Sequence, residues 1–251
     1  MTSQAPMSSV ERRRSILYIA IALIFSMALG GGLIKVGTGF ASRTANGITV
    51  TGSAKLSATA DNVVWTLNVS LTRQTVAEAV TKVGNDVAAV TKYLTEGGIS
   101  AGALTLGSVS TYANEQWLNG NNTGKILNYR ASRDVVVRTK DVQLVAKLSQ
   151  GIGSIMQKGV TVNNYGPQYY ISTLPAMRPK LLAEAMQDAQ VRAEAITKAV
   201  GGKVGSVQSV KSGPFQVTTP DSTMTQDSGA YDTSSIDKTV TATVSVTFSV
   251  K

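Results

Sequence analysis

The side chains that most often carry catalysis and metal binding are missing from this chain. It contains no His and no Cys. Their absence removes the commonest zinc and copper ligands, the usual general base near neutral pH, and the Ser–His and Cys–His nucleophile pairs. Acid–base chemistry would have to use carboxylates or Lys alone. We therefore predict no catalytic residues, no metal and no cofactor, and we expect that the protein is not an enzyme.

Two groups of charged residues have regular spacing. Glu184, Asp188 and Arg192 lie four residues apart on a predicted helix, where surface ion pairing is commoner than proton transfer. Four aspartates with oxygens that would suit Ca²⁺ recur in a loop rich in Ser, Thr and Gly. They are Asp221, Asp227, Asp232 and Asp237. Their spacing matches no compact calcium-binding loop, so we favour a solvated loop.

Aromatic residues give the third candidate site. Trp117, Tyr165 and Tyr169, with Tyr170, could form a surface that binds a sugar or another ligand. Tyr165 and Tyr169 are both odd-numbered and would share one face of a strand. A role in the core or in subunit contact is the favoured alternative.

Residues 15–34 form an apolar stretch of twenty residues without a charge, preceded by Arg12–Arg14 and closed by Lys35. At about 1.5 Å per residue, a helix of this length spans about 30 Å, the thickness of a bilayer's hydrocarbon core. The arginines before it place the N-terminus in the cytoplasm. The predicted order is a cytoplasmic tail (1–14), a single-pass anchor in the cell membrane (15–34), a linker (35–47) and an extracytoplasmic domain (48–251).

A cleaved secretory signal peptide is the alternative for this stretch. The small residues of Ser26-Met27-Ala28 would permit cleavage after Ala28. We favour the uncleaved anchor, because the apolar run is longer than the usual apolar core of a signal peptide.

The part of the chain beyond residue 35 is mildly basic, with 20 Lys and Arg against 14 Asp and Glu. A net charge of +6 could attract acidic polymers or anionic lipid, but a solvated basic surface is the favoured interpretation. The basic residues are dispersed and the domain is predicted to lie outside the cytoplasm. We therefore expect no nucleic acid as a partner.

The first half of the domain shows clear local signals. From Asp61 onward apolar and polar residues alternate, which predicts a strand with one buried face. Thr75 and Glu78 form a capping box that starts a helix, and Gly97-Gly98 ends it. We predict next a strand at 104–112, a loop at 114–124, a strand at 126–138, and a helix capped by Thr139 or Asp141 that runs to about Gln157.

The order then recurs. We predict a strand at 161–172, a helix at about 175–200 with an irregular start near Pro179, a polar loop at 214–235 and a last strand at 240–250. The apolar face of this helix is expected to be Leu182, Ala185, Ala189, Ala193, Ile196 and Val200. The chain thus resembles two strand–helix–strand–loop–strand units, at about 61–138 and 160–250. We predict an α+β fold, in which helices cover one face of a mostly antiparallel sheet.

One stretch of the second long helix carries a family resemblance. Residues 182–196, LAEAMQDAQVRAEAI, followed by 201–207, GGKVGSV, closely resemble the hallmark of the SIMPL-domain family of bacterial envelope proteins, which includes a periplasmic immunogenic protein. Residues 48–52, the pair Ala60-Asp61 and the pair Gly98-Ile99 are similar to further parts of the family pattern. At Ala60 the family more often has Pro. The likeness covers about residues 48–251.

The resemblance implies an α+β fold, no established enzymatic activity, an association with the envelope and oxidative stress, and ring- or channel-like oligomers. It brings no catalytic residues to this chain. Our first hypothesis is a membrane-anchored scaffold that assembles into a ring- or cage-like homo-oligomer. The alternative is a binding module for a glycan, lipid or cation, using Trp117, the tyrosines and the loop at 214–235.

Overall fold

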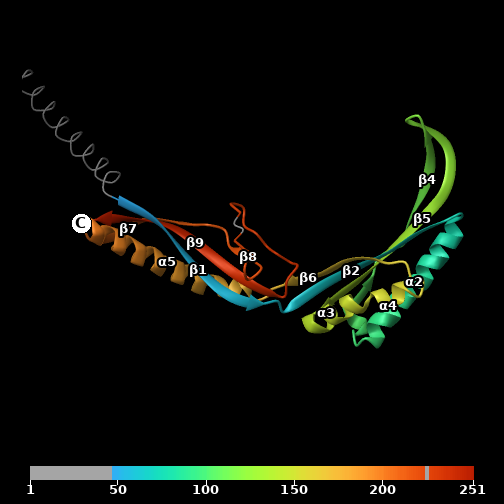
Figure 1. The fold of residues 1–251 in the computed structure, drawn as a ribbon, viewed down its shortest axis with the longest axis horizontal. Coiled ribbons are helices and arrows are strands. Elements are labelled where there is room, and N and C mark those ends of the chain that lie inside the picture. The colour runs from blue at the N-terminus through green and yellow to red at the C-terminus, as the bar shows by residue number, and fades with distance from the viewer. Residues whose placement is uncertain (1–46, 224–225) are drawn as a thin grey trace, which may run out of the picture. The chain divides into compact units, whose positions relative to one another are not determined.

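The computed structural model describes residues 47–223 and 226–251, which form an α+β fold of two sheets and associated helices (Figure 1). The strands are β1 (Gly47–Thr59), β2 (Asn62–Arg73), β3 (Leu104–Leu106), β4 (Ser110–Leu118), β5 (Asn121–Thr139), β6 (Asn163–Tyr170), β7 (Val204–Ser212), β8 (Gln216–Thr218) and β9 (Asp237–Val250). The helices are α2 (Val76–Glu96), the short 3₁₀ helix η1 (Ala101–Ala103), α3 (Val142–Gly151), α4 (Gly153–Met156) and α5 (Leu174–Ala199). The predicted fold class is confirmed.

None of the helices in these ranges is long and apolar enough to cross a bilayer. The predicted tail (1–14) and anchor (15–34) lie outside the described residues, as does the predicted linker (35–47) except for its last residue, Gly47, which begins β1.

The described chain forms two compact units. The large unit contains residues 53–188 and 212–244, and the described part of the small unit contains residues 47–52, 189–211 and 245–251. The elements β1, α5, β7 and β9 contribute residues to both units.

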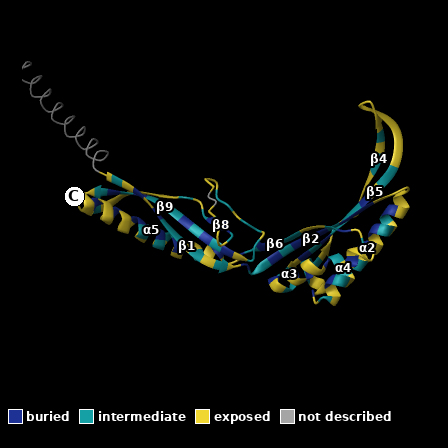
Figure 2. Ribbon diagram, viewed as in Figure 1, coloured by how far each residue is buried: buried dark blue, intermediate teal, exposed yellow. Residues whose placement is uncertain are grey.

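The five-stranded sheet lies in the large unit and has the order β3-β5-β2-β6, with β4 also paired to β5. The pairs of β2 with β5 and β6, and of β5 with β3 and β4, are antiparallel. As predicted, the alternating residues of β2 form its buried face: Val63, Trp65, Leu67, Val69 and Leu71. They share a core with apolar residues of α2, α3 and β5, so these helices cover one face of the sheet (Figure 2).

The other face of this sheet is polar, as the Asn and Ser residues of β2 predict. Asn163 of β6 donates to Asn68 of β2 at 3.2 Å, and Asn68 donates to Asp134 of β5 at 2.6 Å. Arg130 Nε donates to Ser70 Oγ at 2.7 Å. Side-chain hydrogen bonds of this kind link neighbouring strands without an apolar cover.

The caps of the first two helices agree with the sequence. Glu78 N donates to Thr75 Oγ1 and Thr75 N donates to Glu78 Oε2, both at 3.2 Å, which completes the capping box of α2. Gly97 caps the end of α2 and Gly98 has a φ of 104°. Asp141, not Thr139, caps α3, because its Oδ1 accepts from Leu144 N at 3.0 Å.

The loop predicted at 114–124 is wrong. These residues continue two strands that meet in a tight turn at Asn119-Gly120, with φ values of 49° and 81°. Positive φ at both positions matches a type I′ hairpin turn, for which Asn-Gly is a strong signal. The strand predicted at 104–112 is two strands in the structure, β3 and β4, which residues 107–109 separate.

The four-stranded sheet has the order β1-β9-β7, with β8 also paired to β9. Apolar residues of β9 alternate strictly into buried positions: Val240, Ala242, Val244, Val246 and Phe248. The two sheets share a local order, because β9 lies between β1 and β7 as β5 lies between β2 and β3, but the predicted pair of repeated units does not match it. The strand that opens the second predicted unit, β6, pairs with β2 instead.

The buried face of α5 agrees with the predicted one at Ala185, Ala189 and Ala193 and differs from it elsewhere. Its buried residues recur every four positions: Leu181, Ala185, Ala189, Ala193 and Thr197. Ile196 and Val200 are exposed, and α5 continues through Pro179. A strict four-residue step follows one ridge of the helix, and its alanines allow close packing. Thr197 satisfies its hydroxyl by donating to Ala193 O at 2.9 Å.

Candidate functional site

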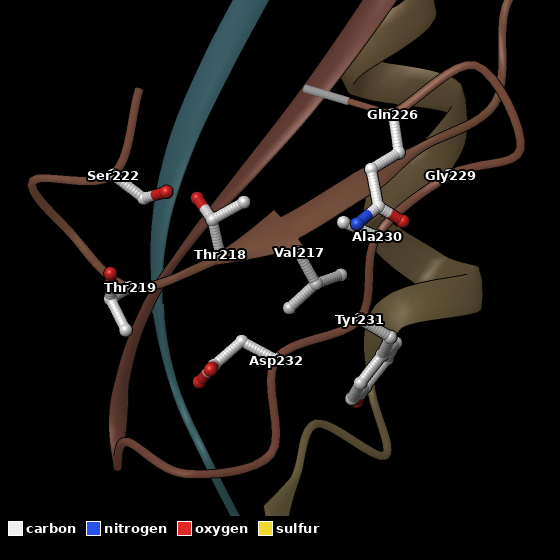
Figure 3. A pocket seen from close by; sticks show the side chains of 9 residues that line it. All are labelled: Val217, Thr218, Thr219, Ser222, Gln226, Gly229, Ala230, Tyr231 and Asp232. Carbon is white, nitrogen blue, oxygen red and sulfur yellow. The ribbon is translucent and has the colours of Figure 1, made fainter. Parts of the chain in front are cut away.

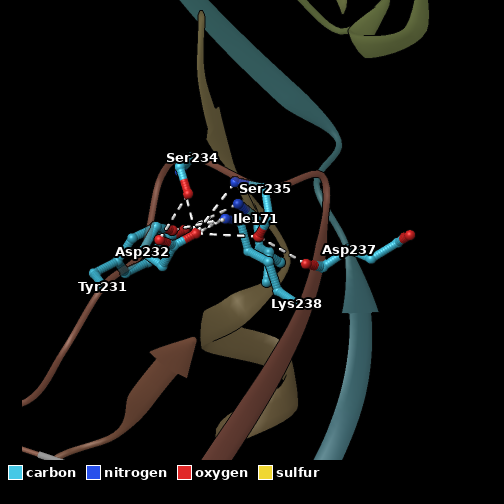
Figure 4. A network of polar contacts seen from close by, with 7 residues as sticks. All are labelled: Ile171, Tyr231, Asp232, Ser234, Ser235, Asp237 and Lys238. Carbon is cyan, nitrogen blue, oxygen red and sulfur yellow. Dashed lines mark hydrogen bonds and ion pairs between the residues drawn. The ribbon is translucent and has the colours of Figure 1, made fainter. Parts of the chain in front are cut away.

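The loop between β8 and β9 is organised around the carboxylate of Asp232 (Figure 4). Asp232 Oδ1 accepts from the backbone nitrogens of Ser234 and Ser235 at 3.1 and 3.2 Å. The Ser234 hydroxyl donates to Oδ2 at 3.0 Å and the Ser235 hydroxyl to Oδ1 at 3.1 Å. A carboxylate that caps a turn in this way fixes the path of the chain.

Lys238, at the start of β9, lies next to this carboxylate and its side chain is fully buried. Its Nζ donates to Asp232 O at 2.7 Å and lies 3.4 Å from Oδ1. A buried ammonium is costly unless it is paired and hydrogen-bonded. Asp232 supplies both the charge and the acceptors, so the loop and β9 stabilise each other here.

The pKa values of this pair shift downward together. Burial lowers the pKa of Lys238, while the charge of Asp232 and its hydrogen bond oppose that shift. Burial acts to raise the pKa of Asp232, but hydrogen bonds from Ser234 and Ser235 and the charge of Lys238 outweigh it and lower the pKa overall. At neutral pH Asp232 is therefore a carboxylate whose lone pairs are already used by donors.

A second set of bonds closes the same loop. The buried side chain of Gln216 donates to Gln226 O at 2.6 Å and accepts from Ala230 N at 2.7 Å. Val217 pairs with the segment around Tyr231, and Tyr231 Oη accepts from Ile171 N at 2.9 Å. The loop predicted to be simply solvated therefore has a fixed scaffold of its own.

This scaffold surrounds an open pocket of about 470 Å³, shown in Figure 3. It is lined by Val217, Thr218, Thr219, Ser222, Gln226, Gly229, Ala230, Tyr231 and Asp232. Hydroxyl and amide groups with one aromatic side chain suit a neutral, hydroxyl-rich ligand better than an anion.

The loop aspartates do not form a metal site. Within residues 47–223 and 226–251, no three carboxylate residues lie close enough together to hold an ion. The two predicted carboxylates on α5, Glu184 and Asp188, have different partners. Glu184 Oε1 lies 3.9 Å from Lys180 Nζ, and Asp188 Oδ2 accepts from Ser53 N at 2.8 Å.

The three predicted aromatic residues do not meet in one place. Trp117 is on β4 and Tyr165 and Tyr169 are on β6, and β5 and β2 lie between these strands in the sheet. Tyr169 belongs to the core, whereas the side chain of Tyr165 is 85% exposed. A register shift in β6 next to Gly166, which has a φ of 84°, puts the two tyrosines in different environments.

Trp117 instead belongs to an exposed hairpin, which we call the arm (residues 110–130 of β4 and β5). It carries large apolar side chains in solvent: Tyr112, Trp117, Leu118, Ile126 and Leu127. Trp117 is 64% exposed and Leu118 56% exposed. Consecutive strand residues point to opposite faces, so these side chains expose apolar surface on both faces of the arm. Large apolar side chains gathered on one exposed element indicate an interaction site.

A family model described as SIMPL, protein of unknown function (DUF541), matches residues 48–248. The chain belongs to the SIMPL family. The match covers both sheets and α5, in agreement with the resemblance seen at 182–207. Among curated proteins, no match was found.

Sequence reasoning missed two residues of the SIMPL domain's loop, Gln216 and Lys238. Lys238 could have been found, because extending the alternation of β9 back by one step from Val240 places it on the buried face. Gln216 gives no such signal, since its partners are backbone groups of a loop that follows it.

Proposed function

We propose that this SIMPL-domain protein is a non-enzymatic scaffold of the cell envelope. In this proposal residues 15–34 anchor it in the cell membrane, the SIMPL domain lies outside the cytoplasm, and copies of the chain assemble into a ring or cage. Its main ionisable pair, Asp232 and Lys238, is engaged in holding a loop, which supports a structural role.

The observation that best supports assembly into an oligomer is the set of exposed apolar side chains on the arm. Trp117 and Leu118 stand next to the hairpin turn, where they are far too exposed to contribute to the core of their own chain. Aromatic and large apolar side chains are enriched at subunit interfaces. A repeated contact through the arm, made once per subunit, would close a symmetric assembly.

The test is the mass of the full-length protein, purified in detergent and measured by light scattering over a range of concentrations. We expect an oligomer, and we expect the double variant Trp117→Ser, Leu118→Ser to shift it toward monomer. Val191→Ser is the matched control, because Val191 is 58% exposed but lies outside the arm. A wild-type monomer at every concentration would contradict the proposal.

A second candidate function, a binding module, rests on the loop pocket. Its Thr, Ser and Gln side chains would bind a neutral glycan. Titration of the full-length protein with neutral oligosaccharides, followed by tyrosine fluorescence, tests it. Thr219→Trp should fill the pocket and abolish binding, whereas Thr123→Trp on the arm should leave binding unchanged.

A further inference from the structure

The net charge of the described chain is concentrated in the small unit. Its 36 described residues contain five Lys and Arg and one Glu, a net charge of +4. The large unit contains 14 Lys and Arg against 13 Asp and Glu, a net charge of +1. Charge asymmetry of this kind indicates a surface that attracts an anionic partner.

Three of these lysines gather where α5, β7 and β9 end or begin. Lys198 is in the last turn of α5. Lys203 and Lys251 exchange backbone hydrogen bonds of 2.8 and 2.9 Å, so they lie side by side. All three side chains are exposed, and within the described residues no carboxylate forms an ion pair with them.

Exposed apolar side chains accompany the lysines. Val200, between Lys198 and Lys203, is 78% exposed, and Ile196 one turn earlier is 49% exposed. A hollow of about 460 Å³ beside them is lined by Glu194, Thr197, Lys198, Gly202, Lys203 and Val204. Lysines next to exposed aliphatic side chains are typical of protein surfaces that rest on anionic lipid.

The proposed anchor would hold this surface near the membrane. Gly47, the first residue of β1, belongs to the small unit and its backbone lies against Thr247 and Phe248. Twelve residues, 35–46, separate the end of the proposed anchor at Ile34 from Gly47. A chain of that length reaches at most about 45 Å. With this anchor, Gly47 of the small unit would stay within this distance of the bilayer surface.

We propose that the small unit docks on the outer surface of the membrane, with Lys198, Lys203 and Lys251 on the headgroups of anionic phospholipids and Val200 at the lipid boundary. This inference rests on the proposed anchor at 15–34. The occupant is the bilayer surface itself, since it is tethered there, carries the complementary charge and accepts aliphatic side chains.

The absence of Cys makes a direct test possible. The full-length variant Val200→Cys is spin-labelled and placed in lipid nanodiscs of phosphatidylcholine, with or without phosphatidylglycerol. Collisions of the label with lipid-soluble oxygen and with a water-soluble nickel chelate report its depth. We expect oxygen contact to dominate only when phosphatidylglycerol is present.

Neutralising each lysine with Gln should lower the ratio of docked to undocked protein by about fivefold. The matched control changes Lys92, Lys125 and Lys158 of the large unit to Gln and should leave the signal at residue 200 unchanged. A label at Val76→Cys, also in the large unit, should not respond to phosphatidylglycerol.

The two proposals fail in different ways. A Val200 label that stays in water while the protein is held in the nanodisc overturns docking and leaves the anchor standing. Protein that does not enter the nanodisc at all overturns the anchor, and docking falls with it. Equal lipid contact in both lipid mixtures overturns the role of the lysines.

Discussion

Lys238 is a fully buried ammonium whose charge partner, Asp232, has a side chain that is 29% exposed. The two residues are therefore unequal in the cost of their removal. Taking away the carboxylate leaves a charge without compensation in the interior, whereas taking away the ammonium leaves a carboxylate that Ser234 and Ser235 still satisfy.

We expect Asp232→Asn to lower the free energy of unfolding by about 2 kcal/mol, less than for a pair buried on both sides. Lys238→Met keeps the volume and removes the buried charge, so we expect a change below about 1 kcal/mol. Urea unfolding measures both. Asp227→Asn, an exposed position in the same loop, is the control.

Asp61 makes the stability of the fold depend on pH, because its carboxylate is hydrogen-bonded in the folded state. The Ser172 hydroxyl and backbone nitrogen donate to its carboxylate at 2.6 and 2.7 Å, and these bonds lower its pKa from the ordinary value of 3.8. Because the folded-state pKa is the lower one, the stabilisation is complete above the ordinary pKa and is lost as pH falls through the folded value.

We therefore expect the wild-type protein to lose more stability between pH 7 and pH 3 than Asp61→Asn does. Denaturant unfolding at the two pH values measures the difference. Equal losses in the two proteins would show that Asp61 does not contribute to acid unfolding.

At the scale of elements, the arm depends on its turn. Gly120 has a φ of 81° and no neighbour that would clash with a Cβ, so a side chain there is opposed by the backbone conformation alone. Gly120→Val should destabilise the turn by about 1–2 kcal/mol. We expect faster amide exchange in residues 110–130 and an unchanged global unfolding midpoint, because the core lies in other residues. A lowered midpoint would contradict this.

Helix α5 provides a matched pair of small residues. Ala185 is fully buried on the four-residue ridge and Ala183 is exposed two residues earlier. Ala185→Leu should destabilise the domain by about 1–3 kcal/mol through overpacking. Ala183→Leu should change stability by less than about 0.5 kcal/mol. Thermal unfolding of the two variants gives the comparison.

Local sequence patterns predicted some elements of the fold correctly, whereas features that depend on packing were not predicted. The alternation in β2 and the capping box of α2 are local, and the structure confirms both. The face of α5 depends on what it packs against, because alanines lie on both its buried and its exposed sides, as Ala185 and Ala183 do. The register shift beside Gly166 separates Tyr165 from Tyr169, and counting residues along a strand cannot reveal it. The Asn119-Gly120 pair is a hairpin-turn signal that could have been recognised, but the neighbouring Asn and Gly residues made the whole segment resemble a loop.

At the scale of the whole molecule, the proposed anchor has a direct chemical test. The mature full-length protein should have an intact mass of about 26.3 kDa and carry its N-terminal arginines. Intact mass spectrometry of the membrane fraction measures this. A mature chain that begins at Leu29 would show a cleaved signal peptide instead, and a cytosolic C-terminal reporter would reverse the predicted topology.

The pairing of β1 with β9 determines when the four-stranded sheet can form. The first strand of the domain, β1, pairs with β9 (Asp237–Val250), so the four-stranded sheet cannot close before β9 has been synthesised. Pairing of ends so distant in sequence is slow. Until β9 arrives, β1 leaves its hydrogen-bonding groups open to proteases and to strands of other nascent chains. A premature stop codon before residue 237 would therefore remove β9 and also leave β1, the first strand of the domain, without its neighbour in the sheet.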